Sequence, residues 1–163
     1  MVEIVYANEK YLESFYEALK SVAKERVYIE MLEPPPFEDV VGFQVGLIRK
    51  NGPVYYAVEV GKVVGWADIF PEDNPRFAHR GSLGMGIIAS HRQQGIGQKL
   101  LAAVLKKAKE FGLEKVELNV YTSNVNAIKL YRKLGFHEEG TVKKYRKLNS
   151  QYVDCLLMAK DLV

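Results

Sequence analysis

The stretch Ile87-Ile88-Ala89-Ser90-His91-Arg92-Gln93-Gln94-Gly95-Ile96-Gly97-Gln98-Lys99-Leu100-Leu101 decides the fold of this chain. It places Gly95 and Gly97, one residue apart, between an extended run and the start of a helix. Glycine permits a turn whose N–H groups converge, and a helix N-terminus carries a partial positive charge of about half a unit. The junction is therefore suited to bind phosphate oxygens, and a pyrophosphate is its natural ligand.

The residues on either side support a strand followed by a helix. Ser82–Ala89 is predicted to be extended, and its glycines, Gly84 and Gly86, indicate a bulge or a close approach to the backbone. Gly97–Phe111 repeats apolar residues at helical spacing, and Gly112 suits the position just past a helix end. We expect this strand to end at a functional edge.

Two other phosphate-binding patterns are excluded. The P-loop needs a hydroxyl after its lysine, and Gln98-Lys99-Leu100 supplies none. The run Gly84–Ala89 matches the dinucleotide fingerprint only on paper, because β-branched residues stand where a helix should open and no βαβ unit precedes it.

The segments before this stretch alternate helical and extended patterns. A short strand at Val2–Tyr6 is followed by a helix that begins after Asn8 and repeats apolar residues from Tyr11 to Val22. Further on we expect a loop at Arg26–Phe37 and a second helix at Phe37–Ile48. A hairpin of Val54–Val60 with Val63–Phe70 is predicted to turn at Gly61-Lys62 in type II′ geometry, and a polar loop follows at Pro71–Arg80.

The segments after it predict a strand, a helix and a final strand pair. Alternation marks a strand around Val116–Val120, and Ala127–Leu134 reads as a helix closed by Gly135-Phe136. The tail from Thr141 to Leu162 is expected to turn around Leu148–Gln151. The order β-α-α-β-β-β-α-β-α-β-β predicts an α+β fold with helices on the faces of a mixed sheet.

Composition sets broad limits. With 163 residues and 48% apolar positions, we expect one domain over 1–163. The net charge, 23 − 20 = +3, favours no nucleic-acid partner, and Lys143–Lys147 is expected to be a solvated face. No stretch suits a membrane span or a signal peptide, so we expect a cytoplasmic protein without a membrane partner. Cys155 is predicted to be a small buried residue, and no metal-ligand spacing is present.

Two motifs resemble those of one family. Arg92-x-x-Gly95-x-Gly97 resembles the Q/R-x-x-G-x-G/A signature of the GNAT N-acetyltransferase superfamily. Asn124–Phe136 is similar to the family's N-x-x-A-I-x-L-Y-x-K-x-G-F segment. The motifs span residues 83 to 136, and the hairpin before and strand pair after match the family's order, so the resemblance covers nearly the whole chain.

The resemblance implies a GNAT-type acyl-CoA N-acyltransferase fold, which has a central, mostly antiparallel mixed sheet, helices on both faces and a parallel strand pair that splays apart. Acetyl-CoA is its implied co-substrate, with no metal. The residues that would bind it are the backbone of the strand end, the loop that holds the pyrophosphate, and two residues of the second motif: Ile87, Ile88 and Ala89; Arg92, Gln93, Gln94, Gly95, Ile96, Gly97 and Gln98; Asn124 and Tyr131.

Tyr131 is the implied catalytic residue, placed near the thioester sulfur. A phenol with a pKa near ~10 can protonate a leaving thiolate without being ionised at neutral pH. By periodicity alone Tyr131 is a core aromatic, and Asn124 is equally suited to cap its helix. For Arg92, the backbone is expected to matter more than the charge.

The implied activity is acetyl transfer to the primary amine of a small molecule by direct attack in a ternary complex. The segments His79–Met85 and Glu139–Tyr145, with Tyr152–Asp154, resemble a bacterial and archaeal subgroup that includes amino-acid acetyltransferases. Acetylation of protein N-termini or lysines and a non-catalytic acetyl-CoA sensor are the alternatives, and a homodimer is left open.

The general base is not determined by the motifs. The ribosomal-protein N-terminal branch carries a glutamate twelve residues before the tyrosine, where this chain has Asn119, which disfavours that branch. Ser82, where some relatives carry a carboxylate, is also unsuited to act as a base. The remaining candidates are Asp68, Glu72, His79 and Glu117.

The acceptor is expected to contact two segments, the loop Arg26–Phe37 and the strand that ends at Phe70. Aromatic and thioether groups there suit a compact apolar substrate, and carboxylates could hold or deprotonate an ammonium. The candidates are Tyr28, Met31, Phe37, Trp66 and Phe70 beside Glu30, Glu33 and Asp68, each of which could instead pack the first helix against the sheet.

Overall fold

The computed structural model describes residues 1–163 and divides into two compact units. The first unit comprises Met1–Phe70 and Leu83–Gly112, and the second comprises Pro71–Ser82 and Leu113–Val163. Hydrogen bonds link the strands in the order β1-β2-β3-β4-β5-β7-β6. The predicted α+β class and mixed sheet are confirmed.

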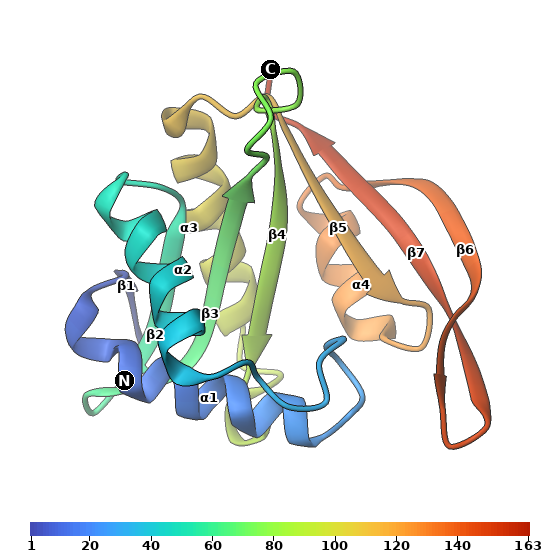
Figure 1. Cartoon of the computed structure of the whole chain (residues 1–163), viewed down its shortest axis with the longest axis horizontal. Helices are drawn as coiled ribbons and strands as arrows, with labels where there is room; N and C mark the ends of the chain where they lie inside the picture. Colours follow the sequence, from blue (N-terminus) through green and yellow to red (C-terminus); the bar gives the residue numbers. More distant parts are fainter. The chain divides into compact units, whose positions relative to one another are not determined.

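The first unit contains three helices, three strands and the end of a fourth (Figure 1). Their bounds are β1 Glu3–Tyr6, the 3-10 turn η1 Glu9–Tyr11, α1 Leu12–Lys24, α2 Phe37–Arg49, β2 Val54–Glu59, β3 Lys62–Pro71, β4 Arg80–Ile87, the 3-10 turn η2 Ala89–His91 and α3 Ile96–Phe111. Strands β1, β2 and β3 pair antiparallel. The predicted helix after the Arg26–Phe37 loop is thereby confirmed as α2.

Helices cover both faces of the sheet in this unit. On β3, a Cβ added to Gly65 would lie 3.3 Å from the Leu100 side chain of α3. The next residue, Trp66, packs edge-on against Phe15 of α1 with ring centroids 5.6 Å apart. Because successive side chains of a strand point to opposite faces, α1 and α3 lie on opposite sides of β3.

The two glycines of β4 are explained by close approach. A Cβ on Gly86 would come within 2.7 Å of Trp66 Cζ2, and a Cβ on Gly84 would lie 2.9 Å from Asp68 Oδ1. Both contacting side chains belong to β3. The predicted approach to this backbone therefore comes from the neighbouring strand.

The hairpin between β2 and β3 turns one residue earlier than predicted. Val60 and Gly61 both have positive φ, 48° and 73°, which is the signature of a type I′ turn. Lys62 already pairs with Glu59 in the ladder. The prediction of a type II′ turn at Gly61-Lys62 was wrong because ladder pairing brings Lys62 into β3 and leaves the exposed Val60 in the turn.

The second unit contains the start of β4, then β5 Lys115–Tyr121, α4 Val125–Lys133, β6 His137–Leu148 and β7 Gln151–Asp161. Strand β4 pairs parallel with β5 at Arg80, Gly81 and Ser82, and β7 pairs antiparallel with both β5 and β6. The turn at Asn149 and Ser150 and the buried position of Cys155 are as predicted. None of the helices is long and apolar enough to cross a membrane.

Candidate active site

The strand-to-helix junction contains the conformation that an anion site requires. Strand β4 ends at Ile87, two residues earlier than predicted, because Ile88 and His91 close the 3-10 turn η2 with a hydrogen bond of 3.0 Å. Gln93 and Gly95 then take positive φ values of 61° and 79°. A Cβ on Gly95 would meet no atom within 4 Å, so this glycine is required for its backbone conformation.

Gly97 does not shape the turn, although the sequence predicted that both glycines would. It lies in the first turn of α3, is buried and is not among the residues of positive φ. Gly95 alone therefore supplies the left-handed turn.

The start of α3 has the features of an anion site. Gly95 is the residue before the helix, and no side chain caps its first N–H groups. The uncapped donors and the dipole of a 16-residue helix favour an anion at this end. The residues predicted for the pyrophosphate, Arg92–Gln98, are brought together in this one loop and helix start.

The Arg92 side chain is engaged within the chain. Its two terminal nitrogens donate to the Glu25 carboxylate at 2.7 Å each, and its Nε donates to the Ile87 carbonyl at 2.9 Å. The guanidinium also stacks over Tyr28, 4.4 Å from the ring centroid. Arg92 therefore joins the end of α1 to the end of β4, and its charge is paired within the chain.

The end of β4 has one edge bonded to β3. Ile88 N–H donates to Val64 O of β3 at 3.0 Å, so the Ile88 N–H predicted to face the cofactor is already used. Backbone groups alternate along an antiparallel strand, and those of Met85 and Ile87 therefore point to the opposite edge. On that edge the Ile87 carbonyl already accepts a hydrogen bond from Arg92. Of the backbone groups predicted to pair with the cofactor, the Ile87 N–H is therefore the one left on this edge. Ala89 is exposed in η2.

Asn124 and Tyr131 belong to the second unit. Asn124 Oδ1 accepts from Ala127 N at 3.4 Å and caps α4, the role that its position also suited in the sequence. Tyr131 is 8% exposed, and its ring centroid lies 5.7 Å from that of Phe136. Burial raises the pKa of Tyr131 above its usual value, so the phenol keeps its proton at neutral pH.

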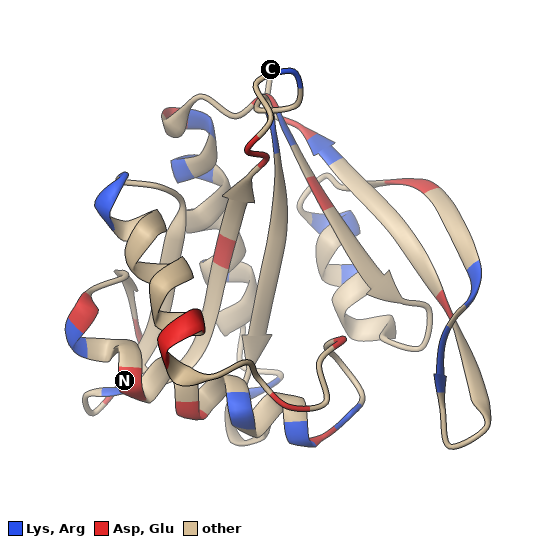
Figure 2. Ribbon diagram, viewed as in Figure 1, with Lys and Arg blue, Asp and Glu red and all other residues tan.

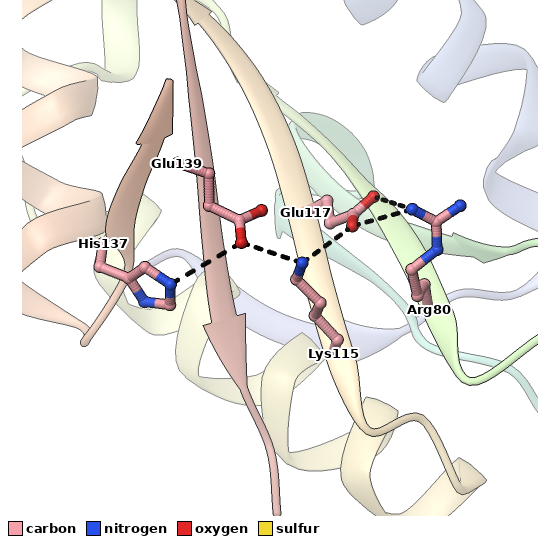
Figure 3. A network of polar contacts seen from close by, with 5 residues as sticks. All are labelled: Arg80, Lys115, Glu117, His137 and Glu139. Atoms are coloured by element: carbon pink, nitrogen blue, oxygen red, sulfur yellow. Dashed lines mark hydrogen bonds and ion pairs between the residues drawn. The ribbon is translucent and has the colours of Figure 1, made fainter. Parts of the chain in front are cut away.

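Glu117, one of the four base candidates, is part of an ion-pair network. Arg80 donates to both of its carboxylate oxygens, at 3.1 and 3.4 Å, and Lys115 lies 3.3 Å away (Figure 3). Lys115 also donates to Glu139, which lies 4.0 Å from His137. Two cations hold the Glu117 carboxylate, so its arrangement is that of a structural ion pair.

Asp68 has the opposite environment. It is 6% exposed, and its Oδ2 accepts from Gln44 Nε2 at 3.0 Å. Desolvation raises the pKa of the Asp68 carboxyl to about 7, and the Gln44 hydrogen bond opposes that rise. The other two candidates differ from it, because His79 is exposed and Glu72 is only partly buried.

Most of the predicted acceptor residues have structural roles. Trp66 is buried against Phe15, Phe37 packs edge-on against Tyr16, and Tyr28 stacks on Arg92. Met31 packs against the core of the first unit. Phe70 is partly buried against the same core and forms an edge-to-face pair with the exposed Phe43, their centroids 6.2 Å apart.

Sequence reasoning missed several of these partners. Gln44 and Tyr56 hold Asp68, and Glu25 holds Arg92, yet each lies in a segment whose pattern indicates only a helix or a strand. His91, which lies 2.7 Å from Glu59, was also missed. A polar residue such as Gln44 on the apolar side of a helix was the one available signal.

Comparisons with known proteins agree with this geometry. The model of the Acetyltransferase (GNAT) family matches residues 10–136. The L-amino acid N-acetyltransferase AaaT of Escherichia coli is 31% identical over 147 residues, which are 89% of this chain and 91% of that protein. An N-alpha-acetyltransferase of Sulfurisphaera tokodaii is 34% identical over 130 residues, 74% of this chain and 76% of that protein.

A solved structure extends the likeness in fold. It is a GNAT phosphinothricin acetyltransferase from Sinorhizobium meliloti in complex with acetyl-CoA, and it has a TM-score of 0.91 at 19% identity. The match covers 99% of this chain and 88% of that one.

Proposed function

The chain belongs to the GNAT acetyltransferase family, and we propose that it transfers the acetyl group of acetyl-CoA to the primary amine of a small molecule, with free L-amino acids or related amines as its acceptors. The family membership makes it an acetyl-CoA-dependent N-acetyltransferase. What is proposed is the class of acceptor and the residues that act.

One observation carries the acceptor class. The likeness to an L-amino acid N-acetyltransferase extends over about nine-tenths of both chains. The exposed Phe43, paired with the partly buried Phe70, supports it, because the pair offers an apolar surface for a compact substrate. Asn119 supports it too, since it stands where the ribosomal-protein branch has a glutamate.

The residues of the chain divide the work of the proposed reaction. Acetyl-CoA supplies an activated thioester when bound. The Gly95 turn and the start of α3 would hold its pyrophosphate, and the free edge at the end of β4 would pair with its pantetheine arm through the Ile87 N–H. Tyr131 would give its phenolic proton to the departing sulfur, for which its neutral form is required.

A second candidate is acetylation of protein N-termini. It is favoured by the similarity to an archaeal N-alpha-acetyltransferase, which extends along about three-quarters of both chains. The two candidates differ in the acceptor alone, so one assay separates them.

The test is a thiol-release assay with purified protein and acetyl-CoA over L-amino acids, polyamines, aminoglycosides and short peptides. We expect the highest kcat/KM with an amino acid or a related small amine. N-acetylated amino acids are the matched control, because they lack the nucleophile and must release no thiol. Turnover confined to peptides would support the second candidate, and binding of acetyl-CoA without turnover of any amine would indicate a sensor.

A further inference from the structure

The carboxyl of Asp68 is buried among largely apolar side chains of the first unit. Lys62 and Asp68 are the charged residues of β3 (Figure 2). Side chains two apart on a strand share a face, so Asp68 lies between Trp66 and Phe70 on the side that α1 covers. An ionised carboxylate in such a place is costly unless it is paired.

Two neutral residues hold this carboxyl in one orientation. Gln44 of α2 donates its Nε2–H to Asp68 Oδ2 at 3.0 Å. The same amide accepts from the Tyr56 hydroxyl of β2 at 2.6 Å, which fixes which end of the amide faces Asp68. The relay Tyr56–Gln44–Asp68 is buried throughout and engages one carboxylate oxygen.

The other oxygen, Oδ1, is turned toward β4. A Cβ at position 84 would come within 2.9 Å of it, so only a glycine allows Oδ1 to approach this backbone so closely. Oδ1 makes no hydrogen bond within the chain and is not among its buried unpaired polar atoms. The accessible part of Asp68 therefore includes this oxygen.

No charged group neutralises Asp68. The groups that face it are the Gln44 amide from α2, the Tyr56 hydroxyl beyond it on β2, and the Gly84 backbone of β4. No ion pair reaches it from any of these elements. Asparagine would keep the hydrogen bond from Gln44 without the charge, so the hydrogen bond alone does not explain why the residue is an acid.

An apolar surface adjoins the carboxyl. Phe70 follows it by two residues on the same face of β3, and Phe43, which is 67% exposed, precedes Gln44 on α2. Their edge-to-face contact places accessible aromatic carbon beside the polar relay. A molecule with an ammonium and an apolar group fits this combination.

We infer that Asp68 is the general base of the reaction and takes a proton from the acceptor ammonium through Oδ1, with Gln44 and Tyr56 as positioning residues. The inference rests on the acetyl transfer proposed above. It applies to any amine acceptor, whether an amino acid or a peptide.

The proton balance of the step is complete. The ammonium nitrogen gives one proton to Asp68, and the neutral amine attacks the thioester carbonyl, so that a C–N bond forms and the C–S bond breaks. The nitrogen loses a second proton to solvent as the amide forms. The thiolate receives one from Tyr131, which regains it from solvent, and Asp68 releases its own to bulk water.

The pH dependence follows from the environment of this carboxyl. Burial raises the pKa of Asp68 to about 7, and only its ionised form accepts a proton. We therefore expect kcat/KM to rise with pH through an apparent pKa near 7. A base with this pKa is ionised in about half of the molecules at neutral pH.

The test compares Asp68→Asn with wild type from pH 5.5 to 9.5. We expect kcat/KM at pH 7.5 to fall about 100- to 10,000-fold, with the affinity for acetyl-CoA unchanged. The limb of the pH profile, that is, the rise of kcat/KM near pH 7, should disappear. Asp73→Asn is the matched control, because Asp73 is exposed, and its profile should equal that of wild type.

Gln44→Leu provides a second, independent variant. It removes the hydrogen bond that opposes the rise in the Asp68 pKa, so the limb should move to higher pH. A merely structural role for the relay would lower stability without moving the limb. If Asp68→Asn fails to fold, this displacement still decides the question.

The outcomes separate this inference from the proposed function. If wild type is active and Asp68→Asn keeps the rise of kcat/KM near pH 7, the role of Asp68 is overturned and the acetyl transfer is left standing. A wild type that turns over peptides alone overturns the acceptor class and leaves the role of Asp68 to be supported or overturned by the same profiles. A wild type inactive with every amine overturns both.

Discussion

Tyr131 shows how one residue satisfies two demands. Its ring packs against Phe136 as a core aromatic should, and the same burial raises the pKa of its phenol. A proton donor to a thiolate must remain neutral until the sulfur departs. The core position and the chemical role are therefore compatible, because the position preserves the protonated form.

Replacement of Tyr131 by Phe tests that role. The variant removes the hydroxyl and keeps the ring, so the packing against Phe136 should survive. We expect kcat to fall about 100- to 10,000-fold and the dissociation constant of acetyl-CoA to stay nearly unchanged. Steady-state kinetics and calorimetry measure the two quantities. Turnover equal to wild type would leave Tyr131 as a core residue only.

At the scale of elements, the junction between β4 and α3 depends on the backbone conformation of Gly95 and on a long-range ion pair. Gly95 takes a left-handed φ of 79° immediately before the helix. Arg92 binds Glu25, which lies 67 positions earlier in the chain and follows α1. The loop to which we assign the pyrophosphate is thus held at both ends, by a backbone turn and by an ion pair.

Gly95→Val should disrupt this junction. A β-branched residue in the left-handed region costs roughly 1 to 2 kcal/mol, and the N–H groups at the start of α3 would move. We expect the affinity for acetyl-CoA to fall at least tenfold while the protein stays folded, since a Cβ there meets no neighbour.

Gly95→Asn is the matched control, because asparagine tolerates the left-handed conformation and should keep most of the affinity. Calorimetry on both variants gives the comparison. Equal affinities for the two would show that the turn at Gly95 does not bind the pyrophosphate.

At the scale of the whole molecule, Asp68 imposes a cost on stability. Its pKa is about 7 in the folded chain and 3.8 at its usual value, so the folded state holds a proton that the unfolded state has lost between these pH values. The contribution of Asp68 to the free energy of unfolding is therefore most favourable below pH 4 and falls as the pH rises to 7. The loss is on the order of 4 kcal/mol.

Asp68→Asn should remove that cost. We expect the variant to be more stable than wild type at pH 8 and nearly equal to it at pH 4, because only the ionised form is penalised. Urea unfolding at both pH values measures the difference. A variant less stable than wild type at pH 8 would mean that the ionised carboxylate stabilises the fold.

The order of elements, the strand-to-helix junction at Gly95 and the family could all be predicted from the sequence. These features are local, since the spacing of apolar residues and the conformational freedom of glycine are written into short stretches. The prediction of a single domain over 1–163 stays a prediction. The hairpin turn at Val60-Gly61 was missed because pairing between strands, rather than local preference, decides which residues enter a ladder.

The different surroundings of the candidate carboxylates follow from the tertiary structure alone. The sequence offered Asp68 and Glu117 as equal candidates. Folding binds Glu117 to Arg80, 37 positions away, and buries Asp68 against Gln44, 24 positions away, beside the backbone of Gly84. Whether a carboxylate is neutralised or left as a base depends on desolvation and on partners brought from distant segments, and neither quantity is a property of the residue or its neighbours in sequence.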